Sequence, residues 1–116
     1  MTFRAIVVTG FAALALLQAP GLAAPARAAD EPIVINIKDH RFDPETVEVP
    51  AGKKVKLLIR NQDPTPEEFE SFSLNREKII AGNSEGVVFV GPLDPGTYEF
   101  IGEFHEDTAQ GKVVVK

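Results

Sequence analysis

Cysteine is absent from the 116-residue sequence, and the only methionine is the first residue, Met1. Without cysteine the chain can form no disulfide, iron–sulfur cluster, thiolate zinc site or thiol nucleophile. Met1 supplies no thioether to a folded domain that begins further along the chain. The sequence therefore excludes sites that depend on sulfur ligands.

Basic residues are scarce relative to acidic ones, with 12 Lys and Arg against 17 Asp and Glu and a net charge of −5. Nucleic-acid binding relies on clustered basic side chains that neutralise phosphates, so nucleic acid is not an expected partner. The sequence also has no phosphate-binding loop and no Ser/His/Asp arrangement of known spacing. A chain of this length fits one small domain, which offers little support for an enzyme with a deep substrate pocket.

The N-terminus has the three-part pattern of a secretory signal peptide. Arg4 provides a positive start, residues 5–17 are almost unbroken apolar sequence, and Ala26-Arg27-Ala28 fits the small-residue cleavage rule. A membrane anchor needs about 20 apolar residues, and glycine and proline interrupt this run, although an uncleaved anchor is the alternative. We expect a signal peptide over residues 1–28 and a periplasmic domain over residues 29–116. Removing two arginines deepens the net charge from −5 to −7.

The rest of the chain has the alternating, β-branched pattern of short β-strands. Turns rich in proline and glycine separate these segments, and no window shows helical periodicity over three turns. Six or seven short strands at this spacing predict an all-β sandwich or barrel. The strands are expected at residues 33–38, 46–49, 54–60, 86–90, 97–101 and 111–115, with Tyr98, Phe100 and Phe104 in the core.

Four stretches of residues 42–115 resemble, in order and spacing, the signatures of a cupredoxin domain. They begin with Phe42-Asp43-Pro44, Asn61-Gln62-Asp63-Pro64, Pro95-Gly96-Thr97-Tyr98 and Gly111-Lys112-Val113. The resemblance implies a cupredoxin-like Greek-key β-sandwich of about seven strands.

The copper ligands of that family are where the sequence departs from the pattern. A blue-copper site uses two imidazoles, a thiolate and a weak axial thioether. By the resemblance, Glu67 takes the place of the first histidine, Gly102 that of the cysteine and Ala109 that of the methionine, and only His105 is retained. A type 1 copper centre is therefore excluded. Gly102 leaves a space that a carboxylate or water could fill.

Two acidic stretches, residues 67–71 (EEFES) and 102–109 (GEFHEDTA), are similar to the EfeO-type cupredoxin-like domain of bacterial ferrous-iron uptake. The resemblance implies an accessory protein that binds iron or copper and assists the oxidation of Fe²⁺. A periplasmic metal-binding protein and an inner-membrane iron permease are the implied partners. Carboxylates with imidazole form a harder ligand set than thiolate with thioether, which suits iron, manganese, zinc or Cu²⁺.

Seven side chains are candidate metal ligands. Alternation along a strand would place Glu67 on one face and Glu68 and Glu70 on the other. The same alternation would place the apolar Phe72 and Leu74 on the face of Glu68 and Glu70. The sequence therefore predicts a bulge or a change of face in this stretch, and it leaves open which glutamate enters the site. The full candidate set is Glu67, Glu68, Glu70, Glu103, His105, Asp107 and His40.

The sequence favours different roles for the two histidines. A metal-bound imidazole commonly has a carboxylate or carbonyl on its second nitrogen, and for His105 the candidates are Glu103, Glu106 and Asp107. For His40 a surface loop histidine is the favoured alternative to a ligand. Glu103 is expected to be exposed or to support another ligand rather than to coordinate. Two other functions stay open: a metal-free module that docks a basic partner, and a non-blue copper-handling or electron-transfer protein.

Overall fold

The computed structural model describes Thr2 and residues 31–116, so the predicted signal peptide, apart from Thr2, and its cleavage site lie outside the described residues. The described chain forms nine β-strands and one short 3₁₀ helix. The described part of the chain contains no helix that could span a membrane. The elements are β1 (Ile33–Lys38), β2 (Arg41–Asp43), β3 (Thr46–Val49), β4 (Val55–Asn61), β5 (Glu67–Ser71), β6 (Arg76–Ile80), β7 (Ser84–Val90), β8 (Gly96–Gly102), η1 (Glu103–His105) and β9 (Gln110–Val115).

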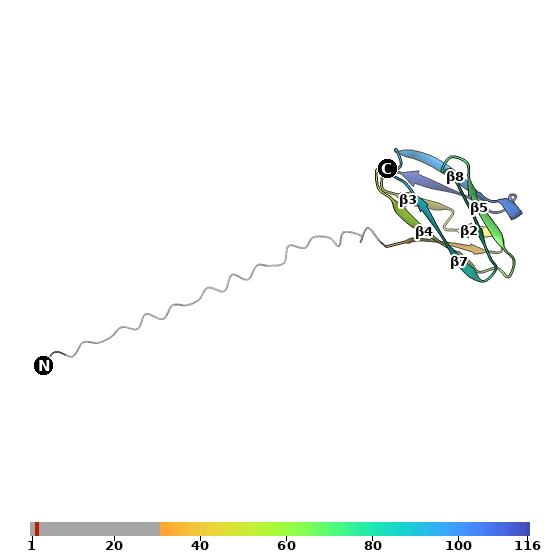
Figure 1. The fold of residues 1–116 in the computed structure, drawn as a ribbon, viewed down its shortest axis with the longest axis horizontal. Coiled ribbons are helices and arrows are strands. Elements are labelled where there is room, and N and C mark those ends of the chain that lie inside the picture. Colours follow the sequence, from red (N-terminus) through yellow and green to blue (C-terminus); the bar gives the residue numbers. More distant parts are fainter. Residues whose placement is uncertain (1, 3–30) are drawn as a thin grey trace.

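The strands form two sheets packed as a sandwich (Figure 1). One sheet has the order β2-β1-β4-β7 and the other the order β3-β9-β8-β5-β6. β1 pairs with β4 and β3 with β9 in parallel, whereas the other pairs are antiparallel. The all-β sandwich is confirmed, but the expected number of about seven strands is wrong. The three-residue β2 is too short for a pattern to show, and four of the five residues of β6 are exposed and give no alternation.

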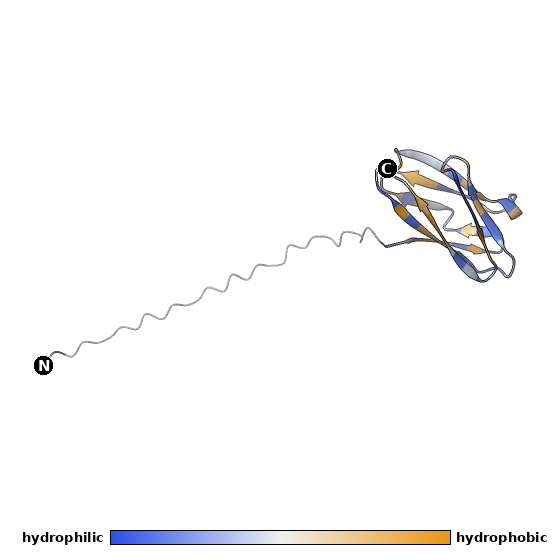
Figure 2. Ribbon diagram, in the orientation of Figure 1, coloured by the Kyte–Doolittle hydropathy of each residue, from blue (hydrophilic) through white to orange (hydrophobic). Residues whose placement is uncertain are grey.

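The core lies between the sheets and is filled by the alternating apolar residues of both. Figure 2 shows hydrophobic stretches along the strands of the sandwich. Ile35, Ile37, Leu57 and Ile59 of the first sheet are fully buried, as the strand pattern predicts. A cluster of three phenylalanines, Phe42, Phe69 and Phe100, joins the sheets, and Phe100 has its ring centroid 4.9 Å from those of the other two. This packing supports the end of the sandwich at which β5 and η1 meet.

The prediction that Phe104 belongs to the core is wrong. It lies in η1, outside the two layers, and is 47% exposed. Phe100 is buried as predicted, and Tyr98 is partly buried against the core. The strand pattern of β8 ends at Gly102, so a residue two positions beyond it no longer follows the alternation.

Candidate metal site

Glu67 is the first residue of β5, and its side chain points into the sandwich, where the residue is only 1% exposed. Its Oε2 accepts a hydrogen bond from Nδ1 of His105 at 2.5 Å. Its Oε1 accepts the backbone N–H groups of Glu68 and Phe104. A buried carboxylate needs such partners, because an unpaired buried charge is very unfavourable. The structure therefore gives the carboxylate partner of His105 as Glu67, not Glu103, Glu106 or Asp107.

Gly102 makes room for this carboxylate. A Cβ atom at position 102 would lie 2.8 Å from Cδ of Glu67 and 2.6 Å from Cβ of Ala109. Both distances are shorter than real contacts, so only glycine fits here without a shift of its neighbours. The space predicted at Gly102 is thus filled by a carboxylate, which stands where the resemblance places the thiolate of a copper protein.

His40 lies against His105 although the two are far apart in sequence. The imidazole rings stack with centroids 3.6 Å apart and planes 18° apart. His40 Nδ1 also lies 3.6 Å from Oδ2 of Asp63, a residue that is 7% exposed. One ring nitrogen of each histidine therefore faces a buried carboxylate. His40 lies in the turn between β1 and β2 with its side chain 42% exposed, and one face of its ring packs on His105.

Asp63 is charged in this setting. Burial pushes the pKa of its carboxyl upward, but the backbone N–H groups of His40 and Asp39 and the nearby imidazoles outweigh burial, and the pKa is lowered from its ordinary value. A carboxylate that accepts two backbone hydrogen bonds is stabilised in its ionised form. The site therefore contains two buried acids beside two imidazoles.

Glu68 and Glu70 point to the opposite face of β5, as strict alternation predicts. Oxygens of Glu68, Glu70 and Glu103 come within 4.8 Å of one another on this outer face, and we call these three residues the outer group. The strand contains no change of face before its end at Ser71. A turn follows, in which Asn75 donates its N–H to the carbonyl of Phe72, and this turn accounts for the shift of phase seen in the sequence.

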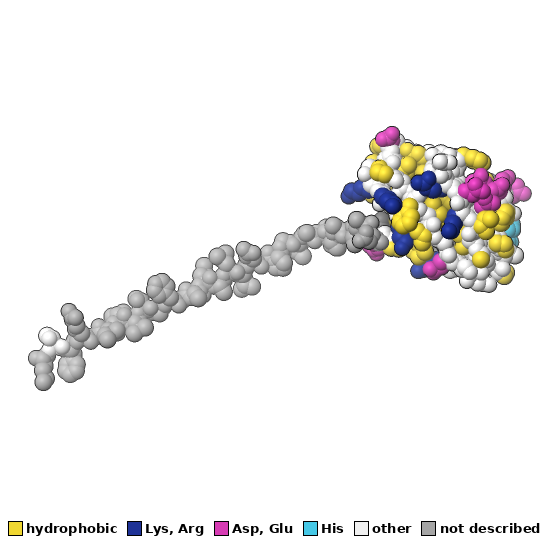
Figure 3. All heavy atoms as spheres, viewed as in Figure 1, with side chains coloured by type: hydrophobic (Ala, Val, Ile, Leu, Met, Phe, Trp, Pro, Cys, Tyr) yellow, Lys and Arg dark blue, Asp and Glu magenta, His cyan; other side chains and the backbone are white. Residues whose placement is uncertain are grey.

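The outer group crowds like charges together, and Figure 3 shows acidic side chains gathered at this end of the molecule. A hydrogen bond with the carboxyl of Glu77, burial and the nearby Glu103 raise the pKa of Glu68 to about 7. A hydrogen bond with Glu103, followed by burial and neighbouring acids, raises the pKa of Glu70 to about 7. Neighbouring carboxylates cannot all ionise without repulsion, so a proton or another cation is favoured among them.

These raised pKa values predict that the protein loses stability as the pH rises. Glu68 and Glu70 have ordinary pKa values of 4.5, so between about pH 4.5 and pH 7 the native state binds more protons than the unfolded chain. The free energy of unfolding then falls with rising pH across this window. We expect a higher Tm at pH 5 than at pH 8.

Glu70→Gln should raise the Tm at pH 8 and flatten its dependence on pH, because it removes one of the repelling charges. The exposed Glu31, changed to glutamine, is the matched control and should leave the profile unchanged. Thermal unfolding followed by circular dichroism measures both. A Tm that rises from pH 5 to pH 8 in the unmodified protein, or a Glu70→Gln profile as steep as the original, would contradict the assignment.

Six of the seven predicted ligands therefore fall into two groups on opposite faces of β5, and Asp107 lies outside both. The inner group is His40, Glu67 and His105, whose ligand atoms also lie within 4.8 Å of one another. Glu103 belongs to the outer group and is exposed, and Asp107 is exposed and belongs to neither group. Asp63 was not predicted as a functional residue. Its sequence context, a turn between two strands, gave no sign that it would face His40.

The inner group offers two imidazoles and one carboxylate, a donor set used for iron, zinc and Cu²⁺. A type 1 copper centre does not fit these residues, because the chain has no cysteine and the Glu67 carboxyl fills the position of the thiolate. A metal ion that enters the group would replace the proton between His105 and Glu67, since ligation requires deprotonated groups.

Comparison with known proteins agrees with the architecture. Residues 6–115 match the family of the cupredoxin-like domain. An uncharacterised protein of Rickettsia prowazekii (strain Madrid E) is 51% identical over 83 residues, which cover 72% of this chain and 66% of that protein. The chain thus spans slightly less than two thirds of the length of this relative.

Solved structures show the same fold at low sequence identity. The metal-binding domain of the Cu(I)-exporting P-type ATPase CopA of Streptococcus pneumoniae D39, solved with Cu(I), aligns with a TM-score of 0.68 and 16% identity, covering 77% of this chain and 88% of that one. Amicyanin of Paracoccus versutus aligns with a TM-score of 0.59 and 18% identity, covering 74% and 82%. From the match over residues 6–115 and the shared two-sheet architecture, the chain belongs to the cupredoxin-like domain family.

Proposed function

We propose that this protein is a periplasmic metal-binding accessory of ferrous-iron uptake that holds one iron or copper ion at His40, Glu67 and His105. The observation that carries the proposal is the convergence of these three side chains within 4.8 Å at one end of the sandwich. His40 comes from the β1–β2 turn, Glu67 from β5 and His105 from η1. Three elements distant in sequence thus bring metal-binding groups to one point.

The chemistry of the donors supports iron as well as copper. Two imidazoles with a carboxylate are a ligand set of non-haem Fe(II) proteins, and imidazoles also suit Cu²⁺. An anionic carboxylate stabilises Fe³⁺ more than Fe²⁺, which favours oxidation of the bound ion by an external oxidant. Within the protein, Glu67 and His105 hold and release the proton that the metal displaces.

The outer group is a second cluster of acidic side chains at the same end of the sandwich. Its carboxylates do not reach the inner group from the opposite face of β5, so one ion cannot be shared by all the predicted ligands. A cation on Glu68, Glu70 and Glu103 would relieve the repulsion that raises two of their pKa values.

The similarity to copper proteins supports a metal-binding role, because one structural neighbour is a CopA domain with Cu(I) and another is a copper-binding protein in its apo form. The link to iron uptake rests on the resemblance of residues 67–71 and 102–109 to the EfeO type. The periplasmic location rests on the predicted signal peptide, and the partners implied are a periplasmic metal-binding protein and an inner-membrane iron permease.

Calorimetric titration with Fe²⁺ (without oxygen), Cu²⁺ and Mn²⁺ tests the proposal. We expect a Kd well below about 1 mM for at least Fe²⁺ or Cu²⁺, with protons released on binding and an affinity that falls from pH 8 to pH 6. The Cu²⁺ form should lack an intense blue absorption because no thiolate is available. No binding tighter than millimolar for any of the three ions would overturn the proposal.

Two alternatives have distinct signatures. A metal-free module that docks a basic partner through the outer group would bind that partner in a salt-sensitive manner, unchanged by chelators. A copper-handling or electron-transfer protein would bind Cu²⁺ far more tightly than Fe²⁺. Neighbouring genes also separate the proposals: a ferrous-iron permease favours iron uptake, and a copper-resistance cluster favours copper handling.

A further inference from the structure

His40 has a left-handed backbone conformation, which is uncommon for residues other than glycine. It is the second residue of the two-residue turn between β1 and β2, in which Lys38 pairs with Arg41. Asp39 has a φ of 53° and His40 a φ of 57°, and such left-handed angles at both residues are typical of tight hairpin turns that favour asparagine and glycine. Aspartate and histidine adopt this region more often than most residues, but two consecutive non-glycine residues in it still carry strain. Hydrogen bonds from outside the turn offset that strain.

The carboxylate of Asp63 provides that support. Its Oδ1 accepts the backbone N–H of Asp39 at 2.8 Å, and its Oδ2 accepts that of His40 at 3.0 Å. The same Oδ2 lies 3.6 Å from Nδ1 of the His40 ring. One buried side chain therefore fixes both residues of the turn and faces one nitrogen of the imidazole.

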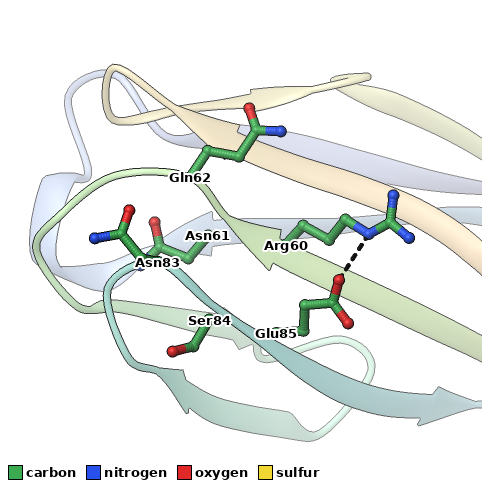
Figure 4. A pocket seen from close by; sticks show the side chains of 6 residues that line it. All are labelled: Arg60, Asn61, Gln62, Asn83, Ser84 and Glu85. Atoms are coloured by element: carbon green, nitrogen blue, oxygen red, sulfur yellow. Dashed lines mark hydrogen bonds and ion pairs between the residues drawn. The ribbon is translucent and has the colours of Figure 1, made fainter.

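Asp63 is itself held firmly. Its backbone N–H donates to Oδ1 of Asn61, whose Nδ2 donates in turn to the carbonyls of Thr65 and Ile80. The backbone carbonyl of Asp63 accepts a hydrogen bond from the N–H of Asn83. Figure 4 shows Asn61 and Asn83 side by side in the pocket next to this loop. The loop after β4 is thus a rigid support for the carboxylate.

A second contact holds the turn from the other side. Oγ1 of Thr108 donates to the carbonyl of His40 at 2.6 Å, and Thr108 follows closely after His105. The turn is therefore tied both to the loop after β4 and to the segment that carries His105. These ties keep the two imidazole rings stacked.

We propose that Asp63 is a positioning residue for metal binding, because its carboxylate holds the β1–β2 turn and orients His40 toward His105 and Glu67. This inference rests on the proposed function and names a residue that supports its site. Groups that orient a ligating histidine are typically worth about 10–100-fold in metal affinity. Asp63 would orient His40 through its two hydrogen bonds to the turn backbone, because its distance of 3.6 Å from Nδ1 is too long for a hydrogen bond to the ring.

NMR of the metal-free protein tests the positioning without reference to metal. Cross-peaks between ring protons of His40 and His105 are expected, since the ring centroids are 3.6 Å apart. Asp63→Asn should lose them, because an amide has one acceptor oxygen for two N–H groups. Asp94→Asn changes an exposed aspartate in the same way and should keep them. Retention of the cross-peaks in Asp63→Asn would overturn the proposal.

Calorimetry with Cu²⁺ alone tests the consequence for binding. Asp63→Asn should raise the Kd about 10–100-fold, and Asp94→Asn should leave it unchanged. In a His40→Ala background, Asp63→Asn should have no further effect, because Asp63 acts through His40. A merely structural role would weaken binding equally in both backgrounds and would contradict the proposal.

Two further outcomes separate this proposal from the proposed function. If His40→Ala binds Cu²⁺ as tightly as the unmodified protein, the metal function stands on Glu67 and His105 and the role of Asp63 is refuted. If the unmodified protein binds no metal, both fail. Should Asp63→Asn not fold, Asp63→Glu keeps the charge and both acceptors but displaces them, and an affinity equal to that of the unmodified protein would overturn the positioning role.

Discussion

Replacing His105 by alanine is expected to weaken the binding of iron or copper by more than about 100-fold. Loss of a supporting partner alone costs about 10–100-fold, and removal of a direct ligand should cost more. The Nδ1 of His105 faces the buried Glu67 carboxylate, and the only other histidine of the sequence, His40, already belongs to the inner group, so no further imidazole is available to replace His105. Calorimetry and the Cu²⁺ electron paramagnetic resonance spectrum report the loss.

Glu67→Gln should have an effect of similar size, because it removes the negative charge and leaves one amide group facing Nδ1 of His105. Asp107→Asn is the matched control: it removes a charge from an exposed side chain that lies near His105 in sequence and in neither group of metal-binding residues. Equal weakening by Asp107→Asn and Glu67→Gln would show that general negative charge, rather than the inner group, binds the metal.

Gly102→Ala is expected to destabilise the protein and to impair metal binding together. The added Cβ would lie 2.6 Å from Cβ of Ala109 and 2.8 Å from Cδ of Glu67, and both neighbours are buried. Overpacking of this kind costs about 1–3 kcal/mol. For a domain of this size each kcal/mol lowers the Tm by about 4–8 °C. Thermal unfolding and calorimetry measure the two effects.

A second substitution separates the two contacts. Ala109→Gly removes the nearer of the two atoms, so the double variant with Gly102→Ala should recover part of the lost stability. Metal binding should stay weak, because the contact with the Glu67 carboxyl remains. A Gly102→Ala protein with unchanged Tm and unchanged affinity would show that the Glu67 carboxyl is not confined by this space.

The sequence predicts the sandwich well because its buried strands alternate strictly. The predicted strands at residues 33–38 and 46–49 coincide with β1 and β3, and four others differ by one or two residues at their ends. β6 escapes prediction because only its last residue, Ile80, is buried, so it has no pattern of alternation. Phe104 is misplaced for a related reason: η1 interrupts the strand period just after Gly102.

The site is less predictable, because its contacts join distant parts of the chain. All three members of the inner group are candidates from the sequence alone. The stacking of His40 on His105, however, joins residues from near opposite ends of the folded segment and depends on how the turn after β1 folds. The separation of Glu67 from Glu68 and Glu70 follows from alternation alone once β5 is a regular strand. Asp63 lies in a loop whose role becomes visible only when its hydrogen bonds to the turn are known.

Pulsed electron paramagnetic resonance of the Cu²⁺-loaded protein tests the central claim most directly, because it counts the imidazoles coordinated to the metal. The inner group predicts two coordinated imidazoles in the unmodified protein, one in His40→Ala and one in His105→Ala, with no intense blue absorption in any of them. A spectrum with no imidazole coordination, or one that neither substitution changes, would contradict a metal site at His40, Glu67 and His105.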